Sequence, residues 1–252
     1  MNSAFFTKKE LKEYFKTPKF IILLIVFIFF SILSPLTARY MNELIAALSP
    51  DLQITLPDPN FQEAWVQFYK NMTSLCLIVL LIIMTGTVAQ EKNKGSIMLV
   101  LTKKVSRFNF LSSKFFAGAL VFTIIFIVGA LINILYTYLL FDAFAYTGLY
   151  LSLVMIWLNG LFYIALAILV SVISKTPTIA ALLGFVGYAI FNLLNISESI
   201  QRFNPAGATS LVNSILAGTS TDFSNWLCLA STIIGTLIML LGSYLIFKKQ
   251  EI

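Results

Sequence analysis

The hydrophobic residues of this 252-residue chain fall into six long stretches that contain no Asp, Glu, Lys, Arg or His. A membrane core about 30 Å thick is crossed by roughly 20 apolar residues in a helix, and each stretch reaches or approaches that length. Runs this uniformly apolar lack the two-residue alternation of barrel strands, so the spanning segments are predicted to be helices. The uncharged stretches are residues 20–38, 71–90, 115–141, 143–174, 176–197 and 223–247.

The pattern predicts an all-α membrane protein that forms a single transmembrane domain over residues 1–252. Hydrophobic residues make up 59% of the chain and charged residues 11%, a balance that excludes a soluble domain with a buried core. The predicted spans are residues 20–38, 71–90, 115–140, 149–174, 177–196 and 225–247.

Lys and Arg residues lie unequally on the two sides of this six-span arrangement. Short cytoplasmic loops retain positive charge during insertion, so the richer side is expected to face the cytoplasm. Of the 17 Lys and Arg residues, only Arg39, Lys70 and Arg202 fall on the poorer side. Both termini are therefore predicted to be cytoplasmic, in a multi-pass protein of a bacterial inner membrane or a plasma membrane.

The formal net charge of +6 does not by itself indicate nucleic-acid binding. The basic residues sit beside span ends, where anionic lipid headgroups and insertion bias explain them. Membrane lipids are therefore expected partners, and nucleic acid is not. The sequence has no His and no cluster of Cys or carboxylates, so no metal site is predicted. Cys76 and Cys228 allow a disulfide but fit better as small apolar side chains within helices.

The segment before the first span, residues 1–19, is predicted to be an amphipathic helix. Thr7 followed by Glu10 has the spacing of a capping box, in which each side chain accepts a hydrogen bond from the other residue's backbone N–H. Pro18 ends the helix because its ring disfavours helical geometry at the preceding residue. The apolar face, opposite the lysines, consists of Leu11, Tyr14 and Phe15. Such a helix is expected to lie flat at the cytoplasmic interface, where it either anchors the first span or docks a partner.

Residues 39–70 form the longest predicted outer connection, and its second half is predicted to be another amphipathic helix. Asp58 before Pro59 provides an N-cap followed by proline at the first helical position. The aromatic residues that then recur at helical spacing are Phe61, Trp65, Phe68 and Tyr69. A helix with this aromatic side is expected to rest on the outer leaflet. A later outer connection, residues 198–222, is expected to be either surface-lying or partly re-entrant.

The connection between the second and third spans is the most specific part of the sequence. A charged strip is followed by Gly95, which permits a sharp change of direction, and then by a short apolar run. Ile97 and Leu101, four residues apart, would present an apolar ridge outside the bilayer, which needs either a partner or the lipid beside it. The segment returns to the third span through a basic turn at residues 102–108.

These features resemble the type 2 exporter permeases of ATP-binding-cassette (ABC) transporters, in particular the six-span subunits encoded separately from their ATPase. The likeness covers essentially the full length and rests on the N-terminal helix, the segment after span two and the Val-Ser-Arg element before span three. It implies that the segment after span two is a cytoplasmic coupling helix that docks on the ATPase beside the N-terminal helix. The implied coupling residues are Glu10, Leu11, Tyr14, Phe15, Glu91, Gly95, Ser96, Ile97, Leu101 and Arg107.

The resemblance also implies two copies of an ABC ATPase subunit, which bind ATP and Mg, and a second permease subunit, identical or homologous. Dimer contacts in this family involve spans one and five, which makes Ala180 and Gly184 candidate interface residues. A phosphate-binding loop ends in Gly-Lys-Ser/Thr, and this sequence has no Gly-Lys dipeptide, so ATP hydrolysis is expected on the partner. No catalytic residue and no cofactor are therefore expected on this chain.

Asparagines inside the predicted spans are candidate residues of a substrate pathway, namely Asn133, Asn159 and Asn192. Hydrogen bonding between helices is the alternative explanation, because a buried amide in lipid seeks a partner. Two other function classes stay open, a carrier or channel that ATP does not drive and a structural membrane scaffold. The spans lack the ionisable group that proton or sodium coupling usually needs, which disfavours a self-sufficient carrier.

Overall fold

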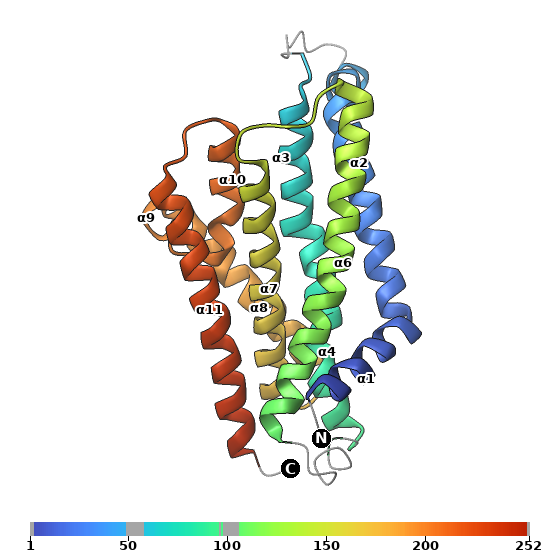
Figure 1. Ribbon diagram of the computed structural model, residues 1–252, viewed down its shortest axis with the longest axis vertical. Coiled ribbons are helices and arrows are strands. Elements are labelled where there is room, and N and C mark those ends of the chain that lie inside the picture. Colours follow the sequence, from blue (N-terminus) through green and yellow to red (C-terminus); the bar gives the residue numbers. More distant parts are fainter. Residues whose placement is uncertain (1–2, 49–57, 96, 98–105, 251–252) are drawn as a thin grey trace.

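The computed structural model describes residues 3–48, 58–95, 97 and 106–250, and its regular structure within those ranges is entirely helical. Most helices run along one long axis, and helix α1 (Ser3–Lys16) lies at the same end as the last turn of α11 (Asp222–Lys249) (Figure 1). The predicted all-α fold with six candidate spans is confirmed. The helical segments long and apolar enough to cross a membrane are Pro18–Ile45, Phe61–Asn93, Arg107–Phe141, Leu149–Ile173, Pro177–Ile196 and Phe223–Lys249.

A break at Thr17 separates α1 from the first spanning helix, α2 (Pro18–Leu48). Thr17 Oγ1 donates to the carbonyl of Tyr14 at 3.1 Å, which closes the end of α1. Pro18 then opens α2, where its missing N–H leaves no bond unmade. The break lets α1 turn away from the axis of α2 (Figure 1), as the predicted helix end before Pro18 requires. Helix α2 continues past residue 38, the predicted end of the first span.

The second membrane-length helix begins earlier than the sequence predicts. Helices α3 (Phe61–Asn71) and α4 (Leu77–Asn93) are joined without a break by a π-helical turn, η1 (Met72–Cys76). The N-cap of α3 is Asn60, whose Oδ1 accepts a hydrogen bond from a first-turn backbone N–H at 3.0 Å. The predicted cap at Asp58 is therefore wrong, and the helix starts two residues later.

Helix α3 does not rest on the outer leaflet as predicted, because its aromatic side is buried in the bundle. Trp65, Phe68 and Tyr69 have no exposed surface. The indole N–H of Trp65 donates to the carbonyl of Phe144 at 2.8 Å, in the connection after α6. An aromatic stripe at helical spacing suits lipid headgroups and a protein core equally well. Of the segment predicted as an outer connection, residues 39–48 therefore continue α2, and residues 61–70 belong to the packed helix α3.

Helices α6 (Arg107–Phe141) and α7 (Leu149–Ile173) form the predicted hairpin at the opposite end from α1. The chain reverses through residues 142–148 with left-handed backbone at Asp142, φ 54°, and Gly148, φ 95°. Asparagine, aspartate and glycine are the residues that adopt this conformation at low cost, so the turn residues match their geometry. Helix α6 begins about two turns before the predicted start of the third span.

After helix α8 (Pro177–Leu193) the chain folds back into the bundle before the last helix. The returning elements are η2 (Leu194–Ile196), α9 (Glu198–Gln201), η3 (Pro205–Gly207) and α10 (Ala208–Leu216). Asn159, in the middle of α7, donates from its Nδ2 to the carbonyl of Pro205 at 2.7 Å. This bond places η3 beside the middle of a spanning helix. Of the two predicted courses for residues 198–222, the structure shows the re-entrant one.

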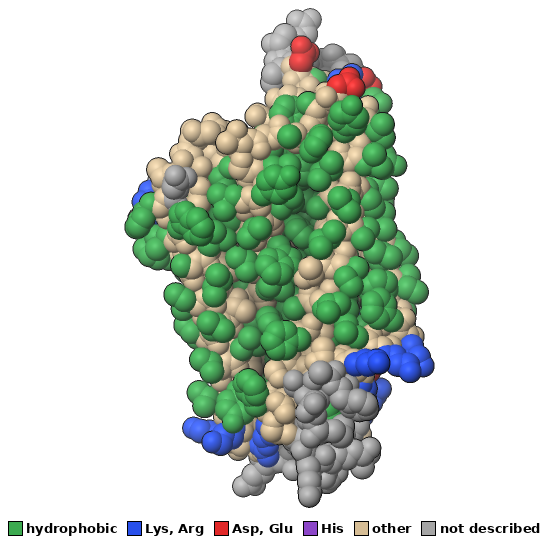
Figure 2. Space-filling model, viewed as in Figure 1, with side chains coloured by type: hydrophobic (Ala, Val, Ile, Leu, Met, Phe, Trp, Pro, Cys, Tyr) green, Lys and Arg blue, Asp and Glu red, His purple; other side chains and the backbone are tan. Residues whose placement is uncertain are grey.

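Hydrophobic side chains cover the middle of the molecule, and charged side chains gather towards its two ends (Figure 2). Helix α7 is the most enclosed span, with Phe162 and Tyr163 each 1% exposed. Helices α8 and α11 are the least covered, and their outward sides carry Leu182 at 63% and Leu237 at 55% exposed. We expect these apolar outward sides to contact lipid or another protein, because exposing so much apolar surface to water is unfavourable.

Candidate functional site

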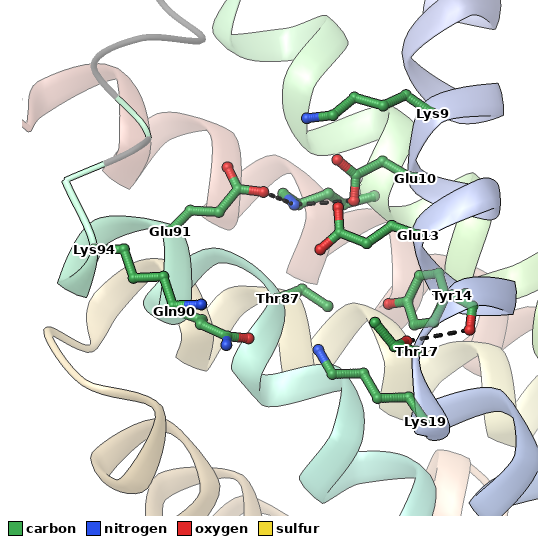
Figure 3. A pocket seen from close by; sticks show the side chains of 11 residues that line it. Lys9, Glu10, Glu13, Tyr14, Thr17, Lys19, Thr87, Gln90, Glu91 and Lys94 are labelled. Atoms are coloured by element: carbon green, nitrogen blue, oxygen red, sulfur yellow. Dashed lines mark hydrogen bonds and ion pairs between the residues drawn. The ribbon is translucent and has the colours of Figure 1, made fainter.

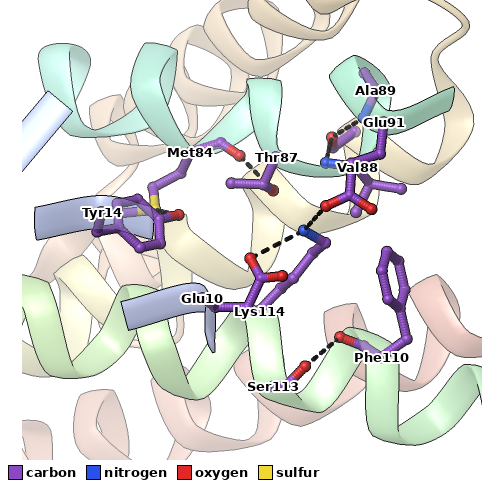
Figure 4. Close-up of polar contacts among 11 residues, drawn as sticks. Glu10, Tyr14, Met84, Thr87, Val88, Ala89, Glu91, Phe110, Ser113 and Lys114 are labelled. Carbon is purple, nitrogen blue, oxygen red and sulfur yellow. Dashed lines mark hydrogen bonds and ion pairs between the residues drawn. The ribbon is translucent and has the colours of Figure 1, made fainter. Parts of the chain in front are cut away.

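Three charged side chains from three helices meet at the end of the bundle where α1 lies. The Nζ of Lys114, on α6, donates to Glu10 Oε2 of α1 at 3.1 Å and to Glu91 Oε1 of α4 at 2.7 Å (Figure 4). Lys114 is 3% exposed and Glu10 is 4% exposed. These three residues, here called the ion triad, connect parts of the chain that lie far apart in sequence.

The buried charges of the ion triad need one another as partners. A buried charge without a partner costs several kcal/mol, and opposite charges with good hydrogen bonds offset much of that cost. The ammonium of Lys114 also lies 4.9 Å from the centre of the Phe110 ring, whose electron-rich face attracts a cation. The triad therefore holds α1 against the end of α4 and the beginning of α6.

Tyr14, one helical turn after Glu10, makes a second connection between α1 and α4. Its hydroxyl donates to Met84 Sδ at 3.2 Å, and its ring is buried (Figure 4). Burial, together with the nearby carboxylates of Glu10 and Glu13, raises the pKa of Tyr14 above its ordinary value, so the hydroxyl keeps its proton. The predicted apolar face of this helix thus turns Tyr14 into the bundle, whereas Phe15 is 49% exposed.

A cavity of about 200 Å³ opens beside the ion triad, between α1, the beginning of α2 and the end of α4 (Figure 3). Its wall carries charges of both signs beyond the triad. They come from Lys9 and Glu13 of α1, Lys19 of α2 and Lys94 at the C-cap of α4. Thr87 and Gln90 add neutral polar groups. This charged cavity is able to hold a polar group at the end of the bundle.

Arg107, at the first position of α6, caps the end of α11. Its Nη1 donates to the carbonyls of Phe247, Lys248 and Gln250 at 2.6, 2.8 and 2.9 Å. The guanidinium also lies 5.6 Å from the centre of the Phe247 ring. The last carbonyls of a helix have no partner within the helix, and a cation there suits the negative end of the helix dipole. Arg107 therefore makes its contacts inside this chain.

Lys92, in the last turn of α4, connects α4 to α7 and to the residue that follows α11. Its Nζ donates to Gln250 Oε1 at 2.6 Å and also to the carbonyl of Val172. Beside it, Ser171 Oγ accepts hydrogen bonds from two backbone N–H groups of α4 at 3.0 and 2.9 Å. No pattern in the sequence predicts these contacts, because Lys92 has the ordinary place of a lysine that flanks a span.

Comparison with known proteins assigns this architecture to a family. The model of a family described as ABC-2 family transporter protein matches residues 5–252. The chain belongs to the ABC-2 family. It is also similar to the uncharacterized transmembrane protein YxlG of Bacillus subtilis (strain 168), with 24% identity over 249 residues, which are 97% of this chain and 96% of that protein. With its six candidate spans, the chain is a multi-pass membrane protein of the ABC-2 transporter type, and the predicted family is confirmed.

Several residues of the predicted coupling set make contacts inside this ABC-2 protein. Ile97 is 2% exposed and packs in the core, so its apolar side chain is not open to a partner. Leu11 is half-buried against the same core. Gly95 has a φ of 68°, in agreement with the predicted change of direction. Ser96 and Leu101, with most of the predicted coupling helix, lie outside the described residues.

The three candidate pathway asparagines have different surroundings. Asn159 is bonded to η3, as described above. Asn192 Nδ2 donates to the carbonyl of Tyr188 at 2.9 Å and to the hydroxyl of Tyr163 at 3.4 Å. Asn133 is fully buried, and its side chain has no hydrogen-bond partner in the part of the chain that the structure describes. Internal hydrogen bonds therefore account for Asn159 and Asn192, while a pathway role for any of the three stays a prediction.

The predicted dimer interface at Ala180 and Gly184 requires correction. Both residues are buried within this chain. A Cβ added to Gly184 would lie 2.8 Å from side-chain atoms of Leu81 and of Thr85, both on α4. The small residues let two helices of one subunit approach closely, which covers this side of α8 before any second subunit arrives.

Proposed function

We propose that this chain is the permease subunit of an ATP-driven exporter. Two permease subunits, identical or homologous, form the substrate pathway, and two copies of an ABC ATPase subunit supply the energy. Membership of the ABC-2 family supports the permease role. The observation that carries the coupling is the ion triad, because it fixes α1 to the helices on either side of the loop predicted to meet the ATPase.

The proposed mechanism transmits a push on that loop to several helices at once. The ATPase subunits close around ATP and Mg and press on α1 and on the loop between α4 and α6. Glu91 stands just before the loop and Arg107 just after it, and both are anchored to other helices. The triad links the push to α1, and Arg107 links it to α11. Helices joined in this way move as one body, as a change of arrangement between two subunits requires.

Contacts within the chain support separate roles for the proposed coupling residues. Glu10, Tyr14 and Glu91 act as internal joints that hold α1 in place, while Phe15 has an exposed ring available for an external contact. A dimer contact through the fifth span uses the outward side of α8, since its small-residue side is covered. The loop and both ends of the chain lie on the cytoplasmic side of the membrane in this proposal, as the distribution of Lys and Arg indicates.

Co-purification and transport assays test the proposal. Expressed together, the chain and a candidate ATPase subunit are expected to purify as a complex, and reconstituted vesicles should transport substrate only when both subunits and ATP are present. Nucleotide hydrolysis by the purified chain alone would contradict the proposal. Transport without the ATPase subunit would instead identify a carrier or channel.

A substitution at Gly95 tests the role of the loop. Gly95→Pro is expected to release the ATPase while the membrane part stays folded, because proline cannot adopt the φ of 68° found there and loses the N–H that donates to Lys92. Gly95→Asn is the matched control, since asparagine tolerates left-handed backbone, and it should retain the complex. Full retention of the ATPase by the proline variant would argue against docking at this loop.

A further inference from the structure

The charged cavity contains charges that the fold itself leaves unpaired. Lys9, Glu13, Lys19 and Lys94 line it, and none of the four has an ion pair or a side-chain hydrogen bond within the described residues. Lys19 and Glu13 reach in from the side of α1 and α2, and Lys94 stands on the opposite wall, formed by α4 (Figure 3). The ion triad adds two carboxylates and one ammonium beside them.

This arrangement of charges selects the chemistry of a ligand. A simple anion would be attracted by the lysines but repelled by the carboxylates of Glu13 and of the triad, and a simple cation would meet the opposite conflict. A zwitterion with its two charges a few bonds apart satisfies both parts of the wall. We propose that the charged cavity binds a phosphoethanolamine group, with the phosphate towards Lys19 and Lys94 and the ammonium towards Glu13 and the triad.

The surroundings of the cavity indicate a membrane phospholipid as the carrier of this group. Lys19 immediately precedes the uncharged stretch of the first span, and on α2 just beyond it Ile21 and Ile25 are 54% and 61% exposed. The rings of Phe15 and Phe20, 4.6 Å apart, extend this apolar surface towards α1. A headgroup held in the cavity therefore leaves its acyl chains beside lipid-facing side chains, in the leaflet at this end of the bundle.

Donor geometry and size distinguish ethanolamine from other headgroups. A primary ammonium offers three N–H donors to carboxylates, whereas the trimethylated nitrogen of choline offers none. A glycerol headgroup has no positive charge to place beside Glu13. The cavity volume of about 200 Å³ leaves room for a phosphate with a short amino-alcohol arm.

Native mass spectrometry of the full-length chain, purified in detergent, tests this inference. The probes are phosphatidylethanolamine, phosphatidylcholine and phosphatidylglycerol with identical acyl chains. Phosphatidylethanolamine is expected to bind about tenfold more tightly than either of the others, a difference of about 1.4 kcal/mol. Equal binding of the three lipids would overturn the proposal.

Two variants assign the ends of the headgroup. Lys19→Gln is expected to weaken binding of phosphatidylethanolamine and phosphatidylglycerol alike, by about tenfold, because both carry the phosphate. Glu13→Gln is expected to weaken only phosphatidylethanolamine, because only that lipid carries the ammonium. Lys12→Gln, on the exposed side of α1 outside the cavity, is the matched control and should change neither. Unchanged phosphatidylethanolamine binding by either cavity variant would overturn the corresponding contact.

A soluble competitor separates a lipid from a free headgroup. Glycerophosphoethanolamine in large molar excess is expected to displace little of the bound phosphatidylethanolamine, because it lacks the acyl chains. Displacement at equal concentration would overturn the assignment to a lipid and leave a soluble phosphoethanolamine as the ligand. These measurements use the chain without ATPase or ATP, so their outcome is independent of the proposed coupling.

Discussion

At the scale of single residues, charges next to the spans do more than orient the chain in a membrane. Lys114 and Glu91 each stand at the edge of an uncharged stretch, one just before it and one just after it. Consecutive spans run antiparallel, so the end of the second span lies beside the beginning of the third. The ion pair between Lys114 and Glu91 is therefore predictable from the sequence. The contact of Glu10 with Lys114 is not predictable, because nothing in the sequence sets the direction of α1 relative to α2 at the break at Thr17. The sequence thus predicts that Glu10 and Glu91 contact a partner, whereas both form ion pairs within the chain.

Removal of the central charge of the triad is expected to destabilise the fold strongly. Lys114→Met should lower the free energy of unfolding by about 3–5 kcal/mol, since it leaves the buried carboxylate of Glu10 without its ammonium partner. Thermal unfolding of the detergent-purified protein measures the change. Lys175→Met, at an exposed lysine, should alter stability by less than about 0.5 kcal/mol. Equal melting temperatures for the two variants would show that the triad does not stabilise the fold.

At the scale of elements, local chemistry predicts where helices end better than it predicts where they pack. Proline at position 18 and the short connection at residues 142–148 end helices as expected, since both effects act within a few residues. The sequence places helix α3 on the outer leaflet because its aromatic residues recur at helical spacing on one side. The same period suits burial, and only the neighbouring α2, α6 and α10 decide between them.

The re-entrant segment after α8 depends on one glycine. A Cβ at Gly207 would lie 2.0 Å from the carbonyl oxygen of Gln201, and backbone cannot rotate away as a side chain can. Gly207→Ala is therefore expected to cost about 1–3 kcal/mol and to raise hydrogen exchange across residues 194–216. Gly86→Ala, in α4 with nothing within 4 Å of the added atom, should be neutral or stabilising by up to about 1 kcal/mol. Wild-type exchange in the Gly207 variant would argue against the re-entrant fold.

At the scale of the whole molecule, the structure shows a bundle that is well packed on one side and bare on another. Helix α7 is enclosed by its neighbours, while the outward sides of α8 and α11 expose large apolar side chains. The contacts of the ion triad, Lys92 and Arg107 all lie at the end of the bundle that holds α1 and the last turn of α11. Polar contacts between helices at one end suit a subunit that a partner moves from that end.

Cysteine labelling tests which end faces the cytoplasm. Thr219→Cys, in the exposed connection before α11, should react with a membrane-impermeant maleimide in intact cells, and Lys249→Cys should react only after the membrane is opened. The native Cys76 and Cys228 are 0% and 1% exposed, so their background labelling should be low. The reverse pattern would put the loop between α4 and α6 outside the cell, where no ATPase can act on it.

The sequence by itself determined the six spans, the helical fold, the break before Pro18, the side rich in positive charge and the resemblance to a permease family. These properties depend on the length and polarity of continuous segments, because each helix must be long and apolar enough to cross the bilayer. Only the tertiary structure decided which charges pair, which side of each helix is covered, and that the segment after α8 turns inward. Those outcomes depend on which helices become neighbours, and a helix with one apolar stripe packs equally well on lipid or on protein.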